Sequence, residues 1–280
     1  RLFTILYVPK DTSQRYPILL MRTPYGIGPY GVDAYKSRIG PNMMFAREGY
    51  IFAYQDVRGK RMSEGDFVAV RPHNPNKISK YEIDESSDTY DTIEWLINNV
   101  GNNNGRVGTW GISAPGFYTT HTVIDAHPAL KAASPQAPVT DWFLGDDRHH
   151  NGAFMFQASF SFLSSYGAVR PEPTPDGTPG FSDYGTPDGY KWYFDVGPIS
   201  NINKRYLDGQ NPLWNAMVDH GTYDAWWQAR TPLPHLRNIS VPTMIVGGFF
   251  DAQDLYGPLK TYQAIERNNP NADNILVMGP

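Results

Sequence analysis

Residues 105–118, GRVGTWGISAPGFY, place a lone serine between a short apolar run and a stretch of alanine, proline and glycine. The run before Ser113 predicts a short buried strand, and the residues after it predict a helix. Gly111 lies two residues before this serine and Gly116 three residues after it. Small residues there are typical of a strained strand-to-helix turn that lifts a serine hydroxyl above a sheet. A serine that only caps a helix is the structural alternative.

Strand and helix patterns alternate on both sides of this turn. β-branched and aromatic runs bounded by Gly, Pro and polar residues predict the strands, and apolar residues at helical spacing predict the helices. Ser86 or Ser87 is the expected cap of the first helix. The alternation favours an α/β fold with a mostly parallel sheet. The predicted strands are residues 3–9, 16–22, 50–59, 106–113, 132–138, 241–251 and 274–280, and the predicted helices are residues 86–101, 116–131 and 254–268.

Residues 141–234 interrupt this alternation. The segment is rich in Pro, Gly and aromatic residues, and its helical patterns are weak. We therefore expect one α/β domain in two parts, residues 1–140 and 235–280. Residues 141–234 should form a mainly helical cap, inserted between the two parts and packed over the edge of the sheet.

Composition excludes several classes of function. The net charge is −4 and no basic stripe is present, which argues against a nucleic-acid partner. No apolar run approaches the roughly 18 residues of a membrane span. The chain has no cysteine, which excludes a disulfide framework, a thiolate nucleophile and a Cys-rich zinc site. Nothing in the sequence predicts a metal or a cofactor. The chain has no start methionine and no signal peptide, so we expect its true N-terminus to be missing. We expect a periplasmic or secreted protein, and a cytoplasmic location is the alternative.

A serine nucleophile needs a base, and the base needs a carboxylate that orients it. In sheets of this type the order along the chain is Ser, Asp or Glu, then His. Asp251 ends a predicted strand and is the expected acid, although an aspartate there can also cap the following helix. The backbone N–H of Ala114 should point toward the oxyanion that develops at the helix N-terminus.

The base is missing from the expected place, because none of the seven histidines follows Asp251. We expect the histidine to lie beyond Pro280, on another part of the polypeptide, so residues 1–280 alone should be nearly inactive. His149, His150 and His235 remain alternatives that would act from an unusual position.

Several segments together resemble the α-amino acid ester hydrolases, which belong with cocaine esterase and the X-prolyl dipeptidyl peptidases. The resemblance spans nearly the whole chain. The segments that carry it are RTPYG at 22–26, QDVRGKRMSEGDF at 55–67, GRVGTWGIS at 105–113, DAHPALKAASPQAP at 125–138 and GGFFDAQDLYG at 247–257.

The resemblance implies an α/β-hydrolase domain, a helical cap inserted before the acid strand and a C-terminal jelly roll, of which this chain would hold the first two. It implies that Ser113 is the nucleophile and Asp251 the triad acid. It also implies that the Tyr25 hydroxyl completes the oxyanion hole with the Ala114 N–H. The family usually has a tyrosine after the nucleophile, so Ala114 should widen the acyl pocket and alter the balance between hydrolysis and acyl transfer.

The ester hydrolases also carry acidic residues that bind the α-ammonium of the substrate. The matching positions here are Asp147, in GDDRHH, and Gln253 and Asp254, in DAQD, so one carboxylate has become an amide. Two acids can still attract one ammonium in a partly dry pocket. The structural alternatives are a solvated loop acid for Asp147 and a first-turn helix acid for Asp254.

The resemblance therefore predicts a bacterial serine hydrolase that cleaves, and in part transfers, acyl groups of α-amino acid esters, with β-lactam amides as a further substrate class. A general carboxylesterase or an X-prolyl dipeptidyl peptidase is the alternative enzyme. A non-catalytic fragment is the alternative if the protein ends at Pro280. The expected partners are a small ester or amide and the rest of its own polypeptide, and a homo-oligomer stays open.

Overall fold

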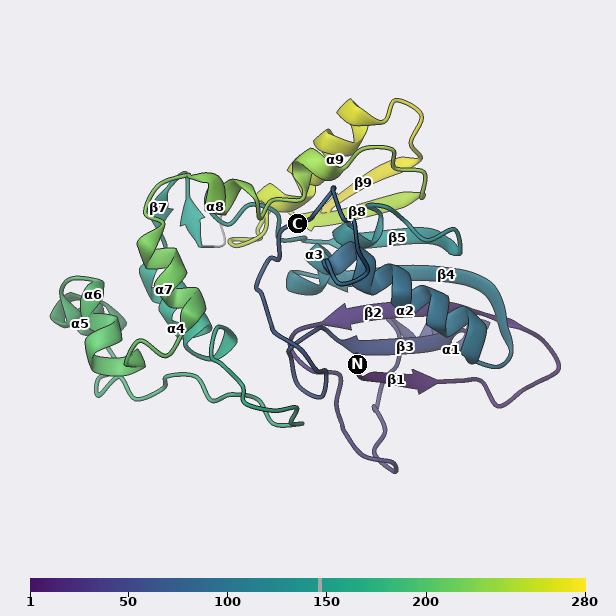
Figure 1. Cartoon of the computed structure of the whole chain (residues 1–280), viewed down its shortest axis with the longest axis horizontal. Helices are drawn as coiled ribbons and strands as arrows, with labels where there is room; N and C mark the ends of the chain where they lie inside the picture. Colours follow the sequence, from purple (N-terminus) through teal and green to yellow (C-terminus); the bar gives the residue numbers. More distant parts are fainter. Residues whose placement is uncertain (146–147) are drawn as a thin grey trace.

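A computed structural model describes residues 1–145 and 148–280, and its centre is a seven-stranded sheet of order β1-β3-β2-β4-β5-β8-β9 (Figure 1). Only β1 runs antiparallel to its neighbour, β3, and the other neighbouring pairs are parallel. The predicted α/β class with a mostly parallel sheet is therefore confirmed. The strands are β1 (Thr4–Tyr7), β2 (Tyr16–Thr23), β3 (Ile51–Asp56), β4 (Asn103–Ile112), β5 (Leu130–Gln136), β8 (Thr243–Gly248) and β9 (Asn274–Gly279).

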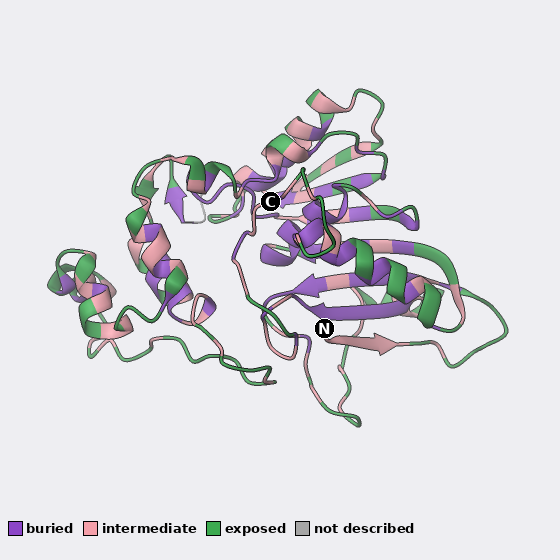
Figure 2. Ribbon diagram, in the orientation of Figure 1, coloured by how far each residue is buried: buried purple, intermediate pink, exposed green. Residues whose placement is uncertain are grey.

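Three helices cover one face of this sheet: α2 (Glu85–Asn99), α3 (Ala114–Thr122) and α9 (Tyr256–Asn268). Apolar residues of α2 and α9 form one continuous core with alternate residues of the strands, such as Ile18, Val107 and Ile245, whereas those of α3 belong to a second core. Figure 2 shows the buried residues concentrated in β2, β3 and α3. The opposite face is covered over β2 and β3 by α1 (Met43–Glu48), whose Phe45 packs beside Phe52 and Tyr54.

A second apolar core lies partly in a helical segment, residues 156–228, which Figure 1 shows beyond the ends of β2 and β3. The rest of this core lies in α3 and in the loops after β3 and β5, with residues such as Phe117, Val57 and Val139. Its rings pack against one another, as where Phe160 stacks on Trp192 with centroids 5.5 Å apart. None of the described helices is both long and apolar enough to cross a bilayer. The segment contains α4 (Phe156–Tyr166), α5 (Gly189–Val196), α6 (Ser200–Ile202), η1 (Asn203–Leu207), α7 (Pro212–Asp219) and α8 (Ala225–Gln228), and it is flanked by β6 (His149–His150), β7 (Ala153–Phe154) and η2 (Leu233–His235).

Two local predictions are wrong at helix ends. The helix after Ser113 stops at Thr122 rather than continuing to residue 131. Asp125 has a left-handed φ of 51°, through which an α-helix cannot continue, and Pro128 further on lacks the N–H that a helix interior needs. The first long helix is capped by Asp84, whose carboxylate accepts a 2.9 Å hydrogen bond from the Ser87 N–H, and not by Ser86 or Ser87.

A buried arginine joins β2 to α2. Arg22 is 3% exposed, and its Nε donates a 2.8 Å hydrogen bond to Gln55 on β3. Its Nη1 donates to the Thr89 hydroxyl at 2.7 Å and lies 3.3 Å from a carboxylate oxygen of Glu85. A buried charge needs partners of this kind, because desolvation alone would cost several kcal/mol. The arginine therefore fixes the end of β2, where the Tyr25 loop begins.

His121 lies near the end of α3 and is enclosed on all sides. It is 1% exposed, and among the described residues neither ring nitrogen has a hydrogen-bond partner. Its ring centroid is 4.3 Å from that of Phe117 and 6.3 Å from that of His73. Burial disfavours the imidazolium, and repulsion from His73 adds to this, so the pKa of His121 falls to about 3.

The buried imidazole should make the protein sensitive to acid. The unfolded chain binds a proton near pH 6.5 and the folded chain only near 3, so stability falls as the pH drops through this window. His121→Phe keeps the ring and removes the titration, so it should lessen the loss of unfolding free energy between pH 7 and pH 4 by about 3 kcal/mol. Urea unfolding at the two pH values measures this. His220→Phe is the control, because His220 Nδ1 lies 2.6 Å from Asp224 Oδ2 rather than in an apolar enclosure. This variant should lose as much unfolding free energy as the wild type. Equal losses in wild type and His121→Phe would contradict the prediction.

Candidate active site

Ser113 sits at the corner between β4 and α3 in a backbone conformation that few non-glycine residues adopt. Its φ is 65° and its ψ is −123°. It occupies the N-cap position of α3, but its side chain makes no capping hydrogen bond. The helix-capping alternative is therefore wrong for the hydroxyl. A strained residue of this kind persists only where its surroundings enforce it, and such sites are often functional.

The backbone on both sides of Ser113 is fixed by hydrogen bonds. Its N–H donates to the Gln136 carbonyl at 3.0 Å, at the end of β5. Its carbonyl accepts from the N–H groups of Phe117 at 3.1 Å and Val139 at 3.4 Å. The turn is thus attached both to its own helix and to the neighbouring strand, and these bonds offset the cost of the strained φ.

Two glycines allow this turn because other backbone atoms lie too close for a side chain. A Cβ at Gly111 would lie 2.3 Å from the Pro115 carbonyl oxygen, in the first turn of α3. A Cβ at Gly116 would lie 2.6 Å from the Gln136 carbonyl oxygen on β5. The glycines that mark the turn in the sequence therefore serve close packing of strand, helix and neighbouring strand.

Ala114 and Tyr25 lie at the ends of adjacent parallel strands. Ala114 is 9% exposed and begins α3, where the first N–H groups have no partner within the helix. Tyr25 follows β2, and its side chain is 43% exposed. Its N–H donates to the Thr23 hydroxyl at 3.1 Å, and its carbonyl accepts from Arg61 at 2.9 Å. Both residues belong to the edge where parallel strands end, the usual ligand site of such sheets.

Asp251 lies at the same edge, three residues after β8. Its Oδ1 accepts hydrogen bonds from the N–H groups of Gln253 at 2.9 Å and Asp254 at 3.0 Å. Within the described part of the chain, Oδ2 has no hydrogen-bond partner. One strand, β5, separates β8 from β4, so Asp251 and Ser113 project from one edge of the sheet. The carboxylate has one oxygen fixed by the backbone and one available to a donor.

A cavity of only ≈ 10 Å³ lies beside the turn after Asp251, and two acids and one amide are among the residues that line it. Asp254 is 6% exposed, and it lines this cavity with Gln253, Asp141 and Tyr256. Sequence reasoning did not find Asp141, although it follows the strand next to that of Ser113. Asp147, the third predicted ammonium ligand, lies outside the described residues.

The Asp141 carboxylate organises the backbone on one side of this cavity. Its Oδ1 accepts from the N–H groups of Phe143 and Leu144, both at 2.9 Å. Its Oδ2 accepts from the Tyr223 hydroxyl at 2.6 Å. Burial and the hydrogen bond to Asp141 raise the pKa of Tyr223. The tyrosine therefore stays a hydrogen-bond donor to the Asp141 carboxylate.

Asp56, at the end of β3, is a second buried acid that sequence reasoning did not select. Its carboxylate is fully buried and accepts from the Tyr30 hydroxyl at 3.0 Å and the Met62 N–H at 3.2 Å. Burial raises its pKa to about 6. Tyr30 also accepts a 3.0 Å hydrogen bond from the Ile27 N–H, so the pair fixes the loop that carries Tyr25.

Most of the histidines have partners away from Ser113. His73 lies 2.9 Å from an Asp84 oxygen, and its ring centroid is 4.7 Å from that of His235. His149 stacks on Phe143 with centroids 4.7 Å apart. Among the described residues, no group of three His, Asp or Glu side chains could hold a metal ion. The remaining histidines are His121, which is buried in α3, His127 beside Glu94, His220 beside Asp224, and His150 in β6.

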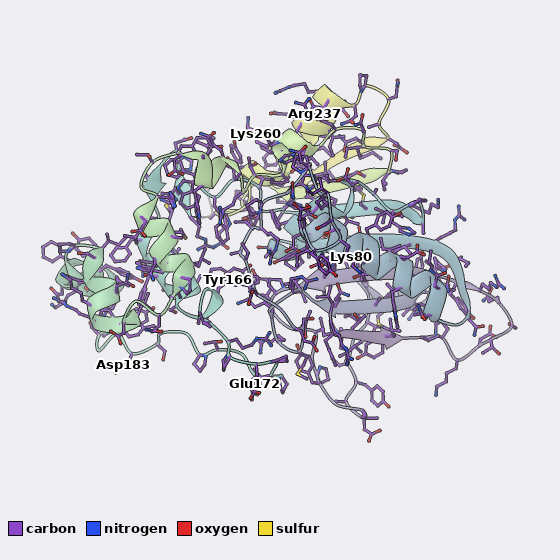
Figure 3. All side chains as sticks on the ribbon, viewed as in Figure 1. Lys80, Tyr166, Glu172, Asp183, Arg237 and Lys260 are labelled. Carbon is purple, nitrogen blue, oxygen red and sulfur yellow. The ribbon has the colours of Figure 1, made fainter. Side chains whose placement is uncertain are left out.

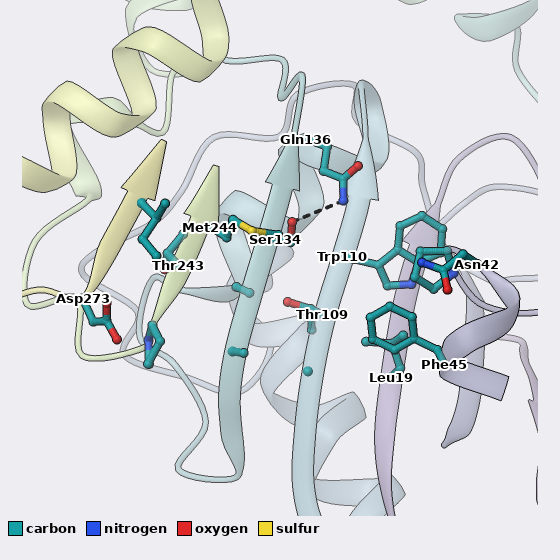
Figure 4. A pocket seen from close by; sticks show the side chains of 16 residues that line it. Leu19, Asn42, Phe45, Thr109, Trp110, Ser134, Gln136, Thr243, Met244 and Asp273 are labelled. Atoms are coloured by element: carbon teal, nitrogen blue, oxygen red, sulfur yellow. Dashed lines mark hydrogen bonds between the residues drawn. The ribbon is translucent and has the colours of Figure 1, made fainter. Parts of the chain in front are cut away.

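A separate apolar groove of ≈ 430 Å³ lies on the sheet face opposite α2, α3 and α9 (Figure 4). Phe45 and Trp110 lie on one side of it and Met244 on the other, and Gln136 donates to the Ser134 hydroxyl at 3.2 Å. None of the predicted site residues that the structure describes lines this groove. The candidate site is therefore the edge where Ser113, Tyr25 and Asp251 project, and not this groove.

Residues 1–280 match the X-Pro dipeptidyl-peptidase (S15) family. Among curated proteins, the chain is 27% identical to cocaine esterase of Rhodococcus sp. (strain MB1 Bresler) over 290 residues, covering 100% of this chain and 46% of that protein. The chain therefore spans less than half the length of this relative.

Solved structures give the same picture. An aminopeptidase from a marine sediment archaeon, Thaumarchaeota archaeon, matches with a TM-score of 0.84 at 33% identity, over 100% of this chain and 46% of that one. An α-amino acid ester hydrolase matches with a TM-score of 0.81 at 34% identity, over 100% of this chain and 45% of that one. The sheet and its flanking helices have the α/β-hydrolase-like fold of these relatives.

The packing at Gly111 gives a direct test of the strained turn. Gly111→Ala places a Cβ against the Pro115 carbonyl, so it should lower the unfolding free energy by about 2–4 kcal/mol. Gly101→Ala is the matched control, because a Cβ there meets nothing within 4 Å, and it should change stability by less than about 0.5 kcal/mol. Denaturant unfolding of the two variants measures the difference. Similar values for both would mean that the turn is not tightly packed.

Proposed function

Because the chain belongs to the X-Pro dipeptidyl-peptidase (S15) family, we propose that it is the catalytic part of a serine hydrolase that cleaves esters of α-amino acids. The observation that carries this proposal is the strained Ser113 turn, with a hydroxyl that caps nothing at the start of a buried helix. Two of the similar solved structures are named as an aminopeptidase and an α-amino acid ester hydrolase, and both names imply attack on an α-aminoacyl carbonyl.

The proposed reaction begins with attack of the Ser113 hydroxyl on the ester carbonyl, while a histidine takes its proton. The carbonyl oxygen becomes an oxyanion, which accepts hydrogen bonds from the Ala114 N–H and the Tyr25 hydroxyl. The histidine then gives its proton to the departing alcohol, and an aminoacyl-serine ester remains. Water attacks this ester with the same base, releasing the amino acid and restoring Ser113.

We assign the base to a histidine outside residues 1–280, oriented by Asp251. Two observations support this assignment. The Asp251 Oδ1 accepts two backbone N–H groups, which leaves Oδ2 directed by the turn and open to an imidazole N–H. His73, His127 and His220 are each beside another carboxylate. On this proposal residues 1–280 alone have very little esterase activity, since loss of a triad member typically costs several powers of ten.

We propose that Asp254 and Asp147 attract the α-ammonium of the substrate. Asp254 is buried beside Asp251, and the neighbouring Asp141 adds a negative charge to the same cavity. A cation in a partly dry pocket gains most from nearby carboxylates. Gln253 contributes an amide in place of a third acid, which weakens this attraction.

Gln253 stands where the ester hydrolases have an acid, and this difference supports a second candidate function, that of a general carboxylesterase. A general carboxylesterase would not need an ammonium site, and an exposed amide at this position suits a neutral acyl group. Acyl transfer to amines, including β-lactam amines, belongs to the main proposal, because the small Ala114 leaves space beside the acyl-enzyme. Comparing a free-amine ester with its N-acetyl analogue separates the α-amino acid ester hydrolase from the general carboxylesterase.

The nucleophile is tested in the whole protein. Ser113→Ala should lower kcat/KM for an α-amino acid ester by at least about 10³-fold and abolish covalent labelling by a fluorophosphonate, because no other group supplies the attacking oxygen. Ser13→Ala, an exposed loop serine, is the control and should keep both properties. Undiminished labelling of the Ser113→Ala variant would refute the assignment.

Ammonium selectivity is tested with an α-amino acid ester and its N-acetyl analogue. Asp254→Asn should lower kcat/KM for the free-amine ester by roughly 1–3 kcal/mol, the range of a charge-assisted contact, and hardly change it for the N-acetyl ester. The effect should weaken as the pH rises through the pKa of the substrate amine. Equal losses on both esters would give Asp254 a structural role. Equal wild-type rates on both esters would favour the carboxylesterase.

A further inference from the structure

A cavity of ≈ 110 Å³ lies between the loops that follow β2 and β3 and the start of the helical segment. Tyr25 lines it on the sheet side, and Tyr166, at the end of α4, lines it from the helical segment (Figure 3). Three basic side chains also line it, Lys60, Arg61 and Arg170. We call this space the cationic cavity.

Lys60 is the most enclosed of the three cations. Its Nζ donates a 2.5 Å hydrogen bond to the Tyr166 carbonyl and lies 4.0 Å from the Phe67 ring centroid. Burial lowers its pKa to about 8, and repulsion from Arg170 and Arg61 adds to this shift. Burial, and to a smaller degree the two neighbouring arginines, therefore disfavour the protonated form of Lys60.

The two arginines also donate to backbone carbonyls rather than to carboxylates. Arg61 donates to Pro175 at 3.1 Å and to Tyr25 at 2.9 Å. Arg170 donates to Arg61 and, at 2.6 Å, to Ser63. Within the described part of the chain, the Arg170 Nε is buried without a hydrogen-bond partner.

The charges around the cationic cavity do not balance. Among the described residues, none of the three cations forms an ion pair within 4 Å. Of the described residues that line the cavity, the exposed Asp176 is the only carboxylate, and the buried Asp56 nearby interacts electrostatically with Arg61 and Arg170. Carbonyl dipoles satisfy hydrogen bonds but do not neutralise charge, so an anion that enters this space gains attraction from three cations at once.

We propose that the cationic cavity binds a carboxylate carried by the leaving group of the substrate, an inference that rests on the proposed function. Tyr25 belongs both to this cavity and to the proposed oxyanion hole, so the carboxylate would lie next to the reacting carbonyl. The acids that would attract the α-ammonium lie at the ends of β5 and β8, on the other side of β4. A substrate with a positive acyl end and a negative leaving group matches this distribution of charge.

The test uses the whole protein and two aminoacyl aryl esters. In one the phenol carries a carboxylate at the meta position, and in the other the methyl ester of that carboxylate. The wild-type protein should prefer the carboxylate, and Arg170→Gln should reduce the ratio of the two kcat/KM values about tenfold, since one charge-assisted contact is lost. The preference should also shrink at high ionic strength.

Three further variants separate charge from structure. Arg170→Lys keeps the charge, so it should retain most of the preference that Arg170→Gln loses. Asp176→Asn removes the only carboxylate of the lining, so it should raise the preference, by about twofold at low salt. Arg237→Gln removes an exposed arginine near α9, far from the lining residue Tyr166 in Figure 3, and should leave the ratio unchanged.

A free carboxylate serves as a second probe of the same cavity. The 3-hydroxybenzoate product should inhibit turnover of the neutral ester competitively, and this inhibition should weaken in Arg170→Gln. Inhibition by the free acid without any preference between the two esters would overturn the assignment to the substrate.

The ratio also distinguishes this inference from the proposed function. Equal ratios in wild type, Arg170→Gln and Asp176→Asn, with the neutral ester still hydrolysed through Ser113, would overturn the carboxylate site and leave the hydrolase intact. Failure to hydrolyse either ester would instead contradict the proposed function.

Discussion

The site depends on one strained residue and on the close contacts that enforce it. Ser113 keeps a φ of 65° because its N–H and carbonyl bond to β5 and α3, and because Gly111 and Gly116 let three backbone segments meet. Strain of this kind costs on the order of 1–3 kcal/mol, which a large core can supply. The hydroxyl is consequently held at the sheet edge before any ligand binds, and that preorganisation is what a nucleophile requires.

The loops around the serine are held by buried charge as well as by apolar packing, such as that of the fully buried Ile27. Arg22 connects β2 to Glu85 and Thr89 of α2 immediately before the Tyr25 loop begins. The loop then returns to β3 through the Tyr30 hydroxyl, which donates to Asp56. A polar network with nearly all its members bonded fixes one geometry, whereas apolar contacts tolerate small slips. Tyr25 is therefore placed by two polar anchors that lie in different strands.

The sequence was sufficient for those parts of the structure that local patterns determine. The alternation of strands and helices predicted a mostly parallel sheet, and the Gly-x-Ser spacing predicted the turn at Ser113. Helix ends were less predictable, because α3 ends before Asp125, which has a left-handed φ of 51°, and Asp84 replaces the expected serine caps. Asp56 and Asp141 were missed, since their importance arises from burial and from partners distant in sequence, Tyr30 and Tyr223. The role of Asp147 stays a prediction.

The order of strands sorts the charges around Ser113. The strand that carries the serine, β4, lies between β2 and β5. Cations from the loops after β2 and β3 and from the helical segment gather beside Tyr25, whereas Asp141, Asp251 and Asp254 follow β5 and β8. An acyl group with an ammonium is thus drawn toward one end of the edge and an anionic leaving group toward the other. With both ends attracted in this way, the ester carbonyl would lie over β4, where the hydroxyl and the Ala114 N–H meet it. The order of the strands would then orient the substrate, and a single serine after the middle strand would be enough to attack the carbonyl held in this orientation.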